Sequence, residues 1–419
     1  AGPYRCDNVR IRAQAVATNH PPHGAFRGFG APQSIFALER HMDKVARAVG
    51  LSPEEFRRRN FLHEGEATAT GQVIREKIEL DALLKRAFEL SDYHAKTKKF
   101  AALNAVNAKE KKGIGFASFL HGAGFTGSGE VYLSSVVGVE ALATGRVRIL
   151  TASTEIGQGT TTIFSQIVAD ALGVDFESIE LAQPDTAYVP NSGPTVASRT
   201  TMVVGKLVES AALGLKQTLL SSGLLQASYS QDEFVAACRA YVERYGALRS
   251  FSKYEPPPNV FWDDAKYQGD AYGAYAWAVY VAEVTVDLVT YETRVDDFVA
   301  LQEVGKVIHP VLAAGQIEGG VAQAIGYALY ENVVWREGRM VNNQMTNYIM
   351  PTSADLPPIR VYFEELPYAY GPSGAKGIGE LPMDGPAPAI LNAIENATGV
   401  SFNEIPLMPE AVMKGLTNQ

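Results

Sequence analysis

The stretch Gly24-Ala25-Phe26-Arg27-Gly28-Phe29-Gly30 is the most informative run in the sequence. Its glycines allow the backbone to turn tightly or to approach a bound group closely. Arg27 offers a planar set of donors that suits phosphate, carboxylate or an oxo group, and the phenylalanine rings can stack on a flat ring. These features predict a loop that holds a polar cofactor beside a flat substrate. From this stretch alone, a glycine-rich turn with two core aromatics and a surface arginine remains the alternative.

The segments around this loop predict a strand and several helices. Residues 8–18 alternate as a strand would. A helix follows from about Pro32 to Val49, so the glycine loop lies just before a helix N-terminus, where backbone N–H groups favour anions. The next segments predict two further helices and then a polar linker, at residues 52–60, 78–92 and 93–112.

Length, charge and cysteine content limit the class of protein. The 419 residues argue for two or more domains that each bury a core. The net charge of -9 argues against nonspecific binding to nucleic acid, which needs a basic surface. Cys6 and Cys238 form no Cys-x-x-Cys pair, which excludes an iron–sulfur cluster on this chain and fits a reducing, cytoplasmic compartment. The longest apolar run, residues 271–282, is shorter than the ~20 residues of a membrane span.

Two further loops with small and polar residues, 154–160 and 194–201, each run into a predicted helix. The first carries a glutamine and no Walker lysine, which excludes an NTPase loop. The second carries hydroxyl side chains, which either cap the helix or bind phosphate. The residues that we single out in these loops are Gln158, Gly159, Ala197, Ser198 and Thr201.

Residues 122–127, Gly-Ala-Gly-Phe-Thr-Gly, match the dinucleotide-binding pattern G-x-G-x-x-G. That pattern requires a helix that opens within it. The following residues 131–137 include three β-branched valines, show no helical stripe and predict a strand instead, so we reject a dinucleotide site here. The glycines then shape a turn or a close approach to a ligand, and Phe125 is a second aromatic residue on a glycine-rich loop.

The last third of the chain adds a glycine-bearing helix and a single carboxylate. Residues 274–303 predict two long strands, and the helix that begins at Pro310 contains four glycine positions and Gln316. Glycine weakens a helix, so we expect something to pack closely against it. Glu380 stands between a glycine run and Leu-Pro-Met, which predicts a raised pKa and a general base. A surface glutamate in a loop is the alternative.

The order of these motifs resembles the molybdenum hydroxylases, the family of xanthine dehydrogenase and aldehyde oxidase. The resemblance covers essentially the whole chain, and its motifs stand in the family's order at similar intervals. They are residues 24–30, Gly157-Gln158-Gly159, Ala197-Ser198, Gly315-Gln316 and Lys376-Gly377-Ile378-Gly379-Glu380.

The resemblance implies roles for these residues. In the family the pterin dithiolene holds the molybdenum without a protein ligand, so we expect no metal ligand on this chain. Arg27 and Glu380 match the arginine of the active-site loop and the glutamate beside the metal, which implies catalytic roles. Phe29 and Phe125 match two phenylalanines that sandwich an aromatic substrate, and we add Thr126 to this substrate site. Cofactor contacts are expected from Gly28, Gln158, Gly159, Ala197, Ser198, Thr201, Gln316 and Gly379.

The reaction implied by the resemblance is hydroxylation with oxygen derived from water. Glu380 takes a proton from a Mo–OH group, the oxygen attacks an electron-poor carbon, and hydride passes to the Mo=S group. The pair Phe29 and Phe125 favours an N-heteroaromatic, xanthine-like substrate over an aldehyde or an aryl thioester, which remain alternatives within the family. The expected cofactor is molybdenum–molybdopterin, in the cytosine dinucleotide form usual for bacterial relatives.

The sequence departs from the family pattern in one large way. The family's catalytic subunit has a first half of several hundred residues with another glycine-rich cofactor motif, whereas this chain starts just before the active-site loop. We therefore expect the N-terminal half as a separate chain or as a missing piece. We also expect iron–sulfur [2Fe–2S] and FAD subunits as partner chains in a hetero-oligomer.

The fold class expected from these elements is α+β, with mixed sheets and helices in two or more domains. We place a first molybdopterin-binding region with the active-site loop at residues 1–155 and a second at residues 156–419. Two hypotheses of another class remain. One is a nucleotide-binding module that uses residues 122–127, and the other is a non-catalytic scaffold that binds a cofactor-bearing partner. The scaffold hypothesis leaves Glu380 without a function.

Overall fold

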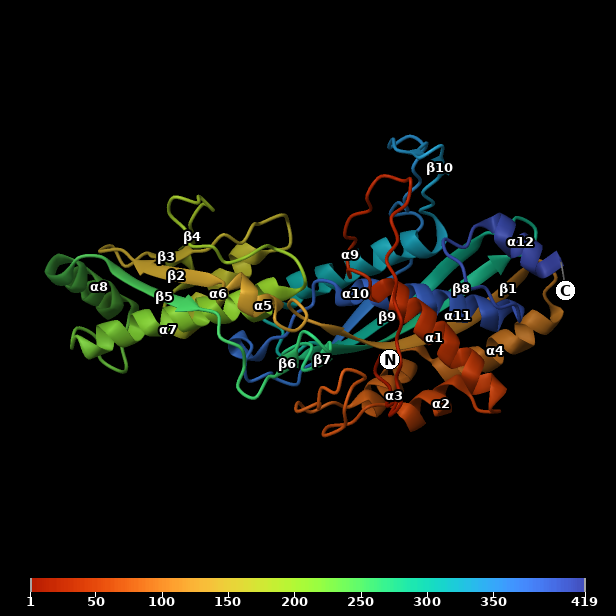
Figure 1. Ribbon diagram of the computed structural model, residues 1–419, viewed down its shortest axis with the longest axis horizontal. Coiled ribbons are helices and arrows are strands. Elements are labelled where there is room, and N and C mark those ends of the chain that lie inside the picture. The colour runs from red at the N-terminus through yellow and green to blue at the C-terminus, as the bar shows by residue number, and fades with distance from the viewer. Residues whose placement is uncertain (1, 418–419) are drawn as a thin grey trace.

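The computed structural model describes residues 2–417 of the chain. Two lobes lie end to end along the long axis of the molecule, and each is built on a four-stranded sheet (Figure 1). The larger lobe combines both ends of the chain, because its cores draw on residues 4–119 and 275–412. The smaller lobe has its core between residues 137 and 248. The mixture of sheets and packed helices confirms the predicted α+β class.

The larger sheet has the strand order β1-β8-β9-β12. The first three strands pair antiparallel, and the last pairs parallel with β9. The two long strands predicted within residues 274–303 are confirmed as β8 and β9. The bounds of the four strands are β1 Glu110–Gly122, β8 Tyr275–Asp287, β9 Thr293–Glu303 and β12 Ile359–Glu364.

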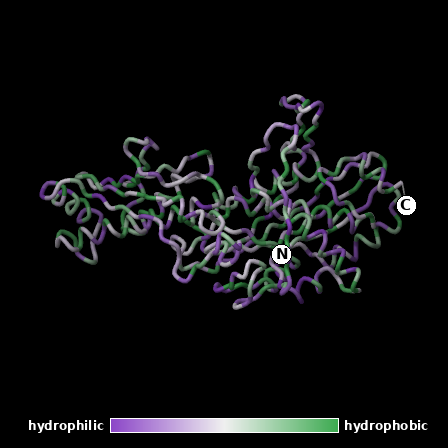
Figure 2. Tube along the Cα trace, viewed as in Figure 1, coloured by the Kyte–Doolittle hydropathy of each residue, from purple (hydrophilic) through white to green (hydrophobic). Residues whose placement is uncertain are grey.

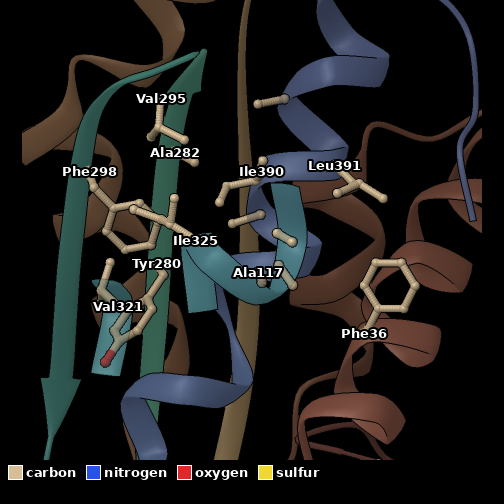
Figure 3. Close-up of a cluster of buried hydrophobic side chains, with 14 of the residues drawn as sticks. Phe36, Ala117, Tyr280, Ala282, Val295, Phe298, Val321, Ile325, Ile390 and Leu391 are labelled. Carbon is tan, nitrogen blue, oxygen red and sulfur yellow. The ribbon is translucent and has the colours of Figure 1, made fainter. Parts of the chain in front are cut away.

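Side chains of β8 alternate between two cores, because successive residues of a strand face opposite sides of its sheet. Trp277 and Val279 face the core that includes α3 (Leu80–Ser91) and α4 (Tyr93–Val106). The other face presents smaller side chains and Tyr280 to three helices, as Figure 3 shows for residues of α9 and α11. These helices are α1 Ala31–Ala48, α9 Pro310–Leu329 and α11 Pro386–Thr398.

The smaller sheet has the order β4-β3-β2-β5, with a parallel pair only between β3 and β4. Helices α6, α7 and α8 supply the rest of its core. Hydrophobic and hydrophilic residues are interleaved along the trace of both lobes (Figure 2), as expected for elements with one buried face. The bounds are β2 Val136–Ala141, β3 Val147–Leu150, β4 Ile179–Leu181, β5 Leu248–Lys253, α6 Thr160–Leu172, α7 Gly205–Ser221 and α8 Gln231–Tyr245.

Short elements make up the rest of the fold. Among all helices of residues 2–417, none is long and apolar enough to cross a bilayer. Helix α2 confirms the helix predicted at residues 52–60, and the Ser52 hydroxyl caps its start by accepting from the N–H of Glu55 at 3.1 Å. The short elements are α2 Pro53–Asn60, α5 Gly129–Leu133, η1 Phe176–Ser178, η2 Thr200–Val204, β6 Trp262–Asp263, β7 Gln268–Gly269, β10 Trp335–Arg336, β11 Arg339–Met340, η3 Pro372–Gly374, α10 Leu381–Asp384 and α12 Pro409–Thr417.

Three local predictions are wrong. Residues 8–18 form no strand, because no other strand of the described chain lies beside them, and their side chains are exposed. The predicted linker at 93–112 contains α4, whose only buried residue is Phe100, so it shows no apolar stripe in the sequence. The short helix α5, not a strand, follows Gly127. A dinucleotide site stays excluded on topology, since β1 and β2 belong to different sheets.

The two cores are nested in the sequence. The smaller lobe is inserted between two parts of the larger one, so the chain crosses between lobes twice. The division of the cofactor-binding regions at residues 155 and 156 stays a prediction. It does not follow this structural boundary, because the core of the smaller lobe has residues on both sides of it.

Candidate active site

The predicted site residues meet at one cavity of about 1100 Å³ that is lined from both lobes. Pockets for drug-sized ligands span roughly 300–1,000 Å³, so this cavity can hold a larger ligand or two ligands. The predicted residues on its wall are Arg27, Gly28, Phe29, Phe125, Thr126, Gln158, Ala197, Ser198, Thr201, Gln316, Gly379 and Glu380. Gly159 is not on the wall and serves as the N-cap of α6. The roles of all these residues stay predictions.

Arg27 fastens the glycine loop to two other parts of the wall. Its Nε donates to the carbonyl of Gly379 at 2.6 Å, and its Nη2 donates to the carbonyl of Gln316 at 3.0 Å. Its Nη1 donates to Gln323 Oε1 at 3.0 Å. Burial lowers the pKa of Arg27, although the nearby carboxylates oppose this shift. The guanidinium therefore positions the loop, and its catalytic role stays a prediction.

Gly28 permits the tight turn of this loop. Its φ is +94°, and a Cβ there would lie 2.5 Å from Pro32 Cγ and 2.9 Å from Asp384 Oδ1. We expect Gly28→Ala to cost about 2 to 4 kcal/mol of stability, from the left-handed backbone and the overpacking together. Thermal unfolding and turnover of the assembled complex measure this effect.

The same loop offers a matched control for that substitution. Gly24 has no positive φ, and no atom lies within 4 Å of the position that an added Cβ would occupy there. Gly24→Ala should therefore change neither measurement. Equal losses for Gly24→Ala and Gly28→Ala would contradict the steric argument.

Glu380 is held at the cavity wall by groups from three other segments. Its Oε1 accepts from the N–H of Gly28 at 3.2 Å, and its Oε2 lies 3.3 Å from His121 Nε2. The Ser198 hydroxyl donates to Oε2 at 3.4 Å and accepts from the Glu380 N–H at 2.9 Å. With 16% of its side chain exposed, the carboxylate can exchange a proton with a ligand in the cavity.

The prediction of a raised pKa for Glu380 is wrong. Burial does raise this pKa, but the bond to His121 and the bonds from Gly28 and Ser198 lower it more, so it lies below its ordinary value. The apolar neighbours in sequence, such as Leu381, turn into the core. The polar partners come from distant segments. At neutral pH Glu380 is therefore ionised, which is the form that accepts a proton.

Two residues that the sequence analysis missed complete the surroundings of Glu380. His121, near the end of β1, is buried, and its Nδ1 lies 2.7 Å from Asp384 Oδ2 on α10. Burial lowers the pKa of His121, but Asp384 and Glu380 raise it more, to about 10. Burial raises the pKa of Asp384 to about 6, against the effect of His121. The available signals were the position of His121 just before the glycine motif, and of Asp384 one helical turn after Glu380.

The loop at residues 194–201 shows backbone strain where it meets the cavity. Ala197 and Ser198 have φ values of +55° and +53°, a region that residues other than glycine rarely adopt. Phe29, with φ of +48°, is a third case on the same wall. Such conformations cost of order 1–3 kcal/mol each and cluster at functional sites. The strain supports a ligand-binding role for this loop.

A buried ion pair ties this loop to the loop that carries Phe125. Arg199 is fully buried and donates to both carboxylate oxygens of Glu130, on α5, at 2.9 and 2.8 Å. Glu130 Oε1 also accepts from the N–H of Phe125 at 3.1 Å. The pair therefore sets the position of Phe125 relative to Ser198, which precedes Arg199.

The loop at residues 154–160 is braced by its own side chains. The Glu155 carboxylate accepts from the backbone N–H groups of Gly157, Gly159 and Thr161, in the loop before α6 and in its first turn. Burial raises the pKa of Glu155, but these three bonds lower it more. The Gln158 amide makes three hydrogen bonds within the same segment. Glu155 thus already supplies an anionic partner to these backbone N–H groups.

The predicted substrate residues lie on the wall from two loops. Phe29 is 73% exposed, and Phe125 is half-buried. Thr126 Oγ1 makes a 2.7 Å hydrogen bond with the hydroxyl of Tyr272, which the sequence analysis missed. The ring of Tyr272 lies directly against Gly122 and also lines the cavity. Tyr272 is therefore available to contact a ligand in this part of the cavity, together with Phe29, Phe125 and Thr126.

The glycines of α9 serve different purposes. At Gly320 a Cβ would lie 2.4 Å from Pro382, so α10 packs directly on α9 and the predicted close approach is confirmed there. Gly315 has open space around it, and its neighbour Gln316 lines the cavity. Close packing on α9 thus holds the segment that carries Glu380.

Comparison with known proteins identifies the family of this chain. The molybdopterin cofactor-binding domain family matches residues 86–357, more than half of the chain, and again residues 1–61. The aldehyde oxidoreductase of Megalodesulfovibrio gigas is 32% identical over 418 residues, which cover 99% of this chain and 44% of that relative. The xanthine dehydrogenase molybdenum-binding subunit of Escherichia coli is 30% identical over 94% of this chain and 53% of its own length.

Solved structures show the same likeness. The quinoline 2-oxidoreductase of Pseudomonas putida 86 superposes with a TM-score of 0.83 at 27% identity, over 95% of this chain and 53% of that chain. The aldehyde oxidoreductase of Desulfovibrio gigas gives a TM-score of 0.82 over 94% of this chain and 42% of that one. This chain spans about half the length of the curated relatives it matches. Through its molybdopterin cofactor-binding domains, the chain belongs to the molybdenum hydroxylase family.

Proposed function

We propose that this chain forms part of a molybdenum-dependent subunit that hydroxylates an N-heteroaromatic, xanthine-like substrate with oxygen derived from water. The observation that carries the proposal is the Glu380 carboxylate, bonded to the Gly28 N–H on a wall that also bears Phe29 and Phe125. An ionised carboxylate beside a ligand cavity is suited to accept a proton. Aromatic rings beside it are suited to hold a flat heterocycle.

The cavity residues fit a molybdenum–molybdopterin cofactor, for which we propose the cytosine dinucleotide form. When bound, this group supplies the redox and oxygen-transfer chemistry. The Ser198 hydroxyl and the Gln316 amide offer it hydrogen bonds, and the strained backbone at Ala197 and Ser198 points to a ligand at this loop. We propose that the pterin dithiolene holds the metal, as the family resemblance implies.

The chain's own residues then divide the remaining work. Glu380 accepts the proton released as the new bond to oxygen forms, and its bonds to Gly28 and Ser198 fix its direction. Arg27 holds the glycine loop against the segment of Gly379 by donating to the Gly379 carbonyl. Phe29 and Phe125 hold the substrate ring and exclude water from it.

The partners we propose are the N-terminal half of the subunit, as a separate chain or as a preceding piece, and iron–sulfur and FAD subunits in a cytoplasmic hetero-oligomer. Residues 8–18 support this proposal, because they are exposed and alternate like a strand that lacks a partner in the described chain (Figure 1). An extended segment of this kind can add to the sheet edge of another chain or domain.

Metal analysis tests the proposed function directly. The protein is purified with its partner chains, and molybdenum and iron are quantified by inductively coupled plasma mass spectrometry. Molybdenum near one per copy of this chain, with iron in excess, is the expected result. Absence of molybdenum from a complex that retains its partners and its full activity would overturn the proposal.

The choice of substrate class predicts a selective effect of the two phenylalanines. We expect Phe29→Ala and Phe125→Ala each to raise KM for an N-heteroaromatic substrate about 3- to 10-fold, from a stacking contribution of about 0.5–1.5 kcal/mol. Steady-state kinetics with a purine and with a small aliphatic aldehyde measure the difference. Phe176→Ala is the control, because Phe176 lies in η1 away from the cavity. A lower KM for the aldehyde than for the purine in the unaltered complex would favour an aldehyde substrate instead.

A further inference from the structure

His121 is enclosed between two carboxylates that come from one short segment. Its Nδ1 lies 2.7 Å from Asp384 Oδ2, and its Nε2 lies 3.3 Å from Glu380 Oε2. Both ring nitrogens thus have an acidic partner, so both carry a proton when the imidazolium forms. The side chain of His121 is 10% exposed, and that of Asp384 is fully buried. Glu380 and His121 line the cavity, whereas Asp384 is not on its wall.

The Asp384 carboxylate is buried with few hydrogen-bond partners. Within residues 2–417 its Oδ1 is buried without a hydrogen-bond partner, and its other oxygen bonds only to His121. An orphaned, buried carboxylate oxygen is costly. The ion pair with His121 is therefore the main interaction that keeps Asp384 charged in this core.

We propose that His121 and Asp384 are positioning residues for the base: Asp384 orients the imidazole, and the imidazole Nε2–H holds the Glu380 carboxylate toward the cavity. This proposal rests on the proposed function of Glu380. The arrangement follows a general design, in which a group that touches the reactants is aimed by a second group that a third one orients.

The charges around the set agree with this assignment. Arg27, on the glycine loop, interacts favourably with both Glu380 and Asp384. Tyr272 and Tyr280 are the other titratable side chains that face the carboxylates, and burial raises the pKa of each. Among the described residues, His121 is the histidine that lowers the pKa of both Glu380 and Asp384. Without His121, the two carboxylates would lose a nearby positive charge that lowers their pKa values. Burial, which raises the pKa of both, would then have the larger effect.

Kinetics over a range of pH test the assignment. In His121→Phe we expect kcat to fall with little change in KM, and the acid limb of kcat/KM to move to higher pH by about 1 unit or more, because Glu380 loses a cation within hydrogen-bonding distance. His121→Gln, whose amide can still donate to Glu380, should retain more activity than His121→Phe. His63→Gln, at an exposed position outside the cavity, is the control. A uniform loss of activity with an unmoved acid limb would overturn the proposal.

A second measurement needs neither molybdenum nor turnover. Hydrogen–deuterium exchange at the imidazole C2 position, followed by mass spectrometry of the assembled complex, reports the titration of each histidine. His121 should titrate near pH 10 in the unaltered protein and at lower pH in Asp384→Asn. Titration of His121 at pH 6.5 with no response to Asp384→Asn would overturn the proposal. Because this result is independent of metal content, it separates a failure of this inference from a failure of the proposed function.

Discussion

Glu380→Gln should lower kcat of the assembled complex by about 100- to 10,000-fold, the usual contribution of a positioned general base. The amide has nearly the shape of the carboxylate, so it can still accept the hydrogen bond from Gly28. It cannot accept a proton at accessible pH. The loss should therefore appear in kcat, while KM and the molybdenum content stay close to those of the unaltered complex.

The lowered pKa of Glu380 leads to a prediction about how stability and turnover depend on pH. The pKa of Glu380 is lower in the folded protein than in the unfolded chain. The stability that its hydrogen bonds contribute is therefore fully present at a pH above the unfolded-state pKa, and it is lost as the pH falls through the folded-state pKa. The base should accordingly remain ionised to below pH 4.5, its ordinary pKa. The acid limb of kcat/KM for the unaltered complex belongs in that range. A limb centred well above pH 4.5 would mean that another group limits the reaction.

A matched substitution separates the role of Glu380 from a general effect of removing a carboxylate. Glu404 is exposed in the segment before α12 and lies outside the cavity, so Glu404→Gln should leave kcat and KM unchanged. Retention of full turnover by Glu380→Gln, with molybdenum present, would exclude Glu380 as the base. It would then favour a role in cofactor binding or a scaffold function for the chain.

Local composition singled out several loops that line the cavity, and the family resemblance supplied the roles predicted for their residues. The glycine loop at residues 24–30, the loops before α6 and α7, and Glu380 were all placed from residue types and spacing, and they meet at one cavity. Helices such as α1 and α3 and the long strands β8 and β9 carry clear periodicity, so they were also predictable, whereas α4 and α5 were not. These features follow from interactions between residues near each other in sequence.

The features that were missed depend on contacts across the fold. His121 and Glu380 are 259 positions apart, and only the packing of β1 beside α10 brings them together. That contact reverses the direction of the pKa shift predicted for Glu380 from its apolar neighbours. The strand predicted at residues 8–18 failed for the complementary reason. Its pattern is that of a strand, but no strand of the described chain lies beside it.

Breaking the Arg199–Glu130 pair should have the largest effect on stability. Neither side chain has appreciable contact with solvent, and the pair is bidentate. Arg199→Met leaves the Glu130 carboxylate buried without its partner, which costs about 3–5 kcal/mol in comparable cases. We expect a pronounced drop in the melting temperature of the complex and in the yield of folded protein, measured by calorimetry and by gel filtration.

The activity of Arg199→Met should fall as well, because Glu130 also holds the N–H of Phe125. The loop that carries Phe125 and the loop that carries Ser198 would lose their link. Turnover of a heteroaromatic substrate should fall more than the molybdenum content does, since the loop at residues 154–160, for which we propose cofactor contacts, keeps its own hydrogen bonds.

The double substitution Arg199→Met with Glu130→Leu separates the cost of an unpaired charge from the value of the pair itself. Replacing a whole buried ion pair by apolar residues is often neutral for stability, so the double variant should regain most of the melting temperature lost in Arg199→Met. It should not regain activity, because leucine cannot accept the hydrogen bond from the N–H of Phe125. Arg58→Met, which breaks the exposed pair with Asp81, is the control and should have little effect. If the double variant is as unstable as the single one, packing and not charge pairing dominates at this position.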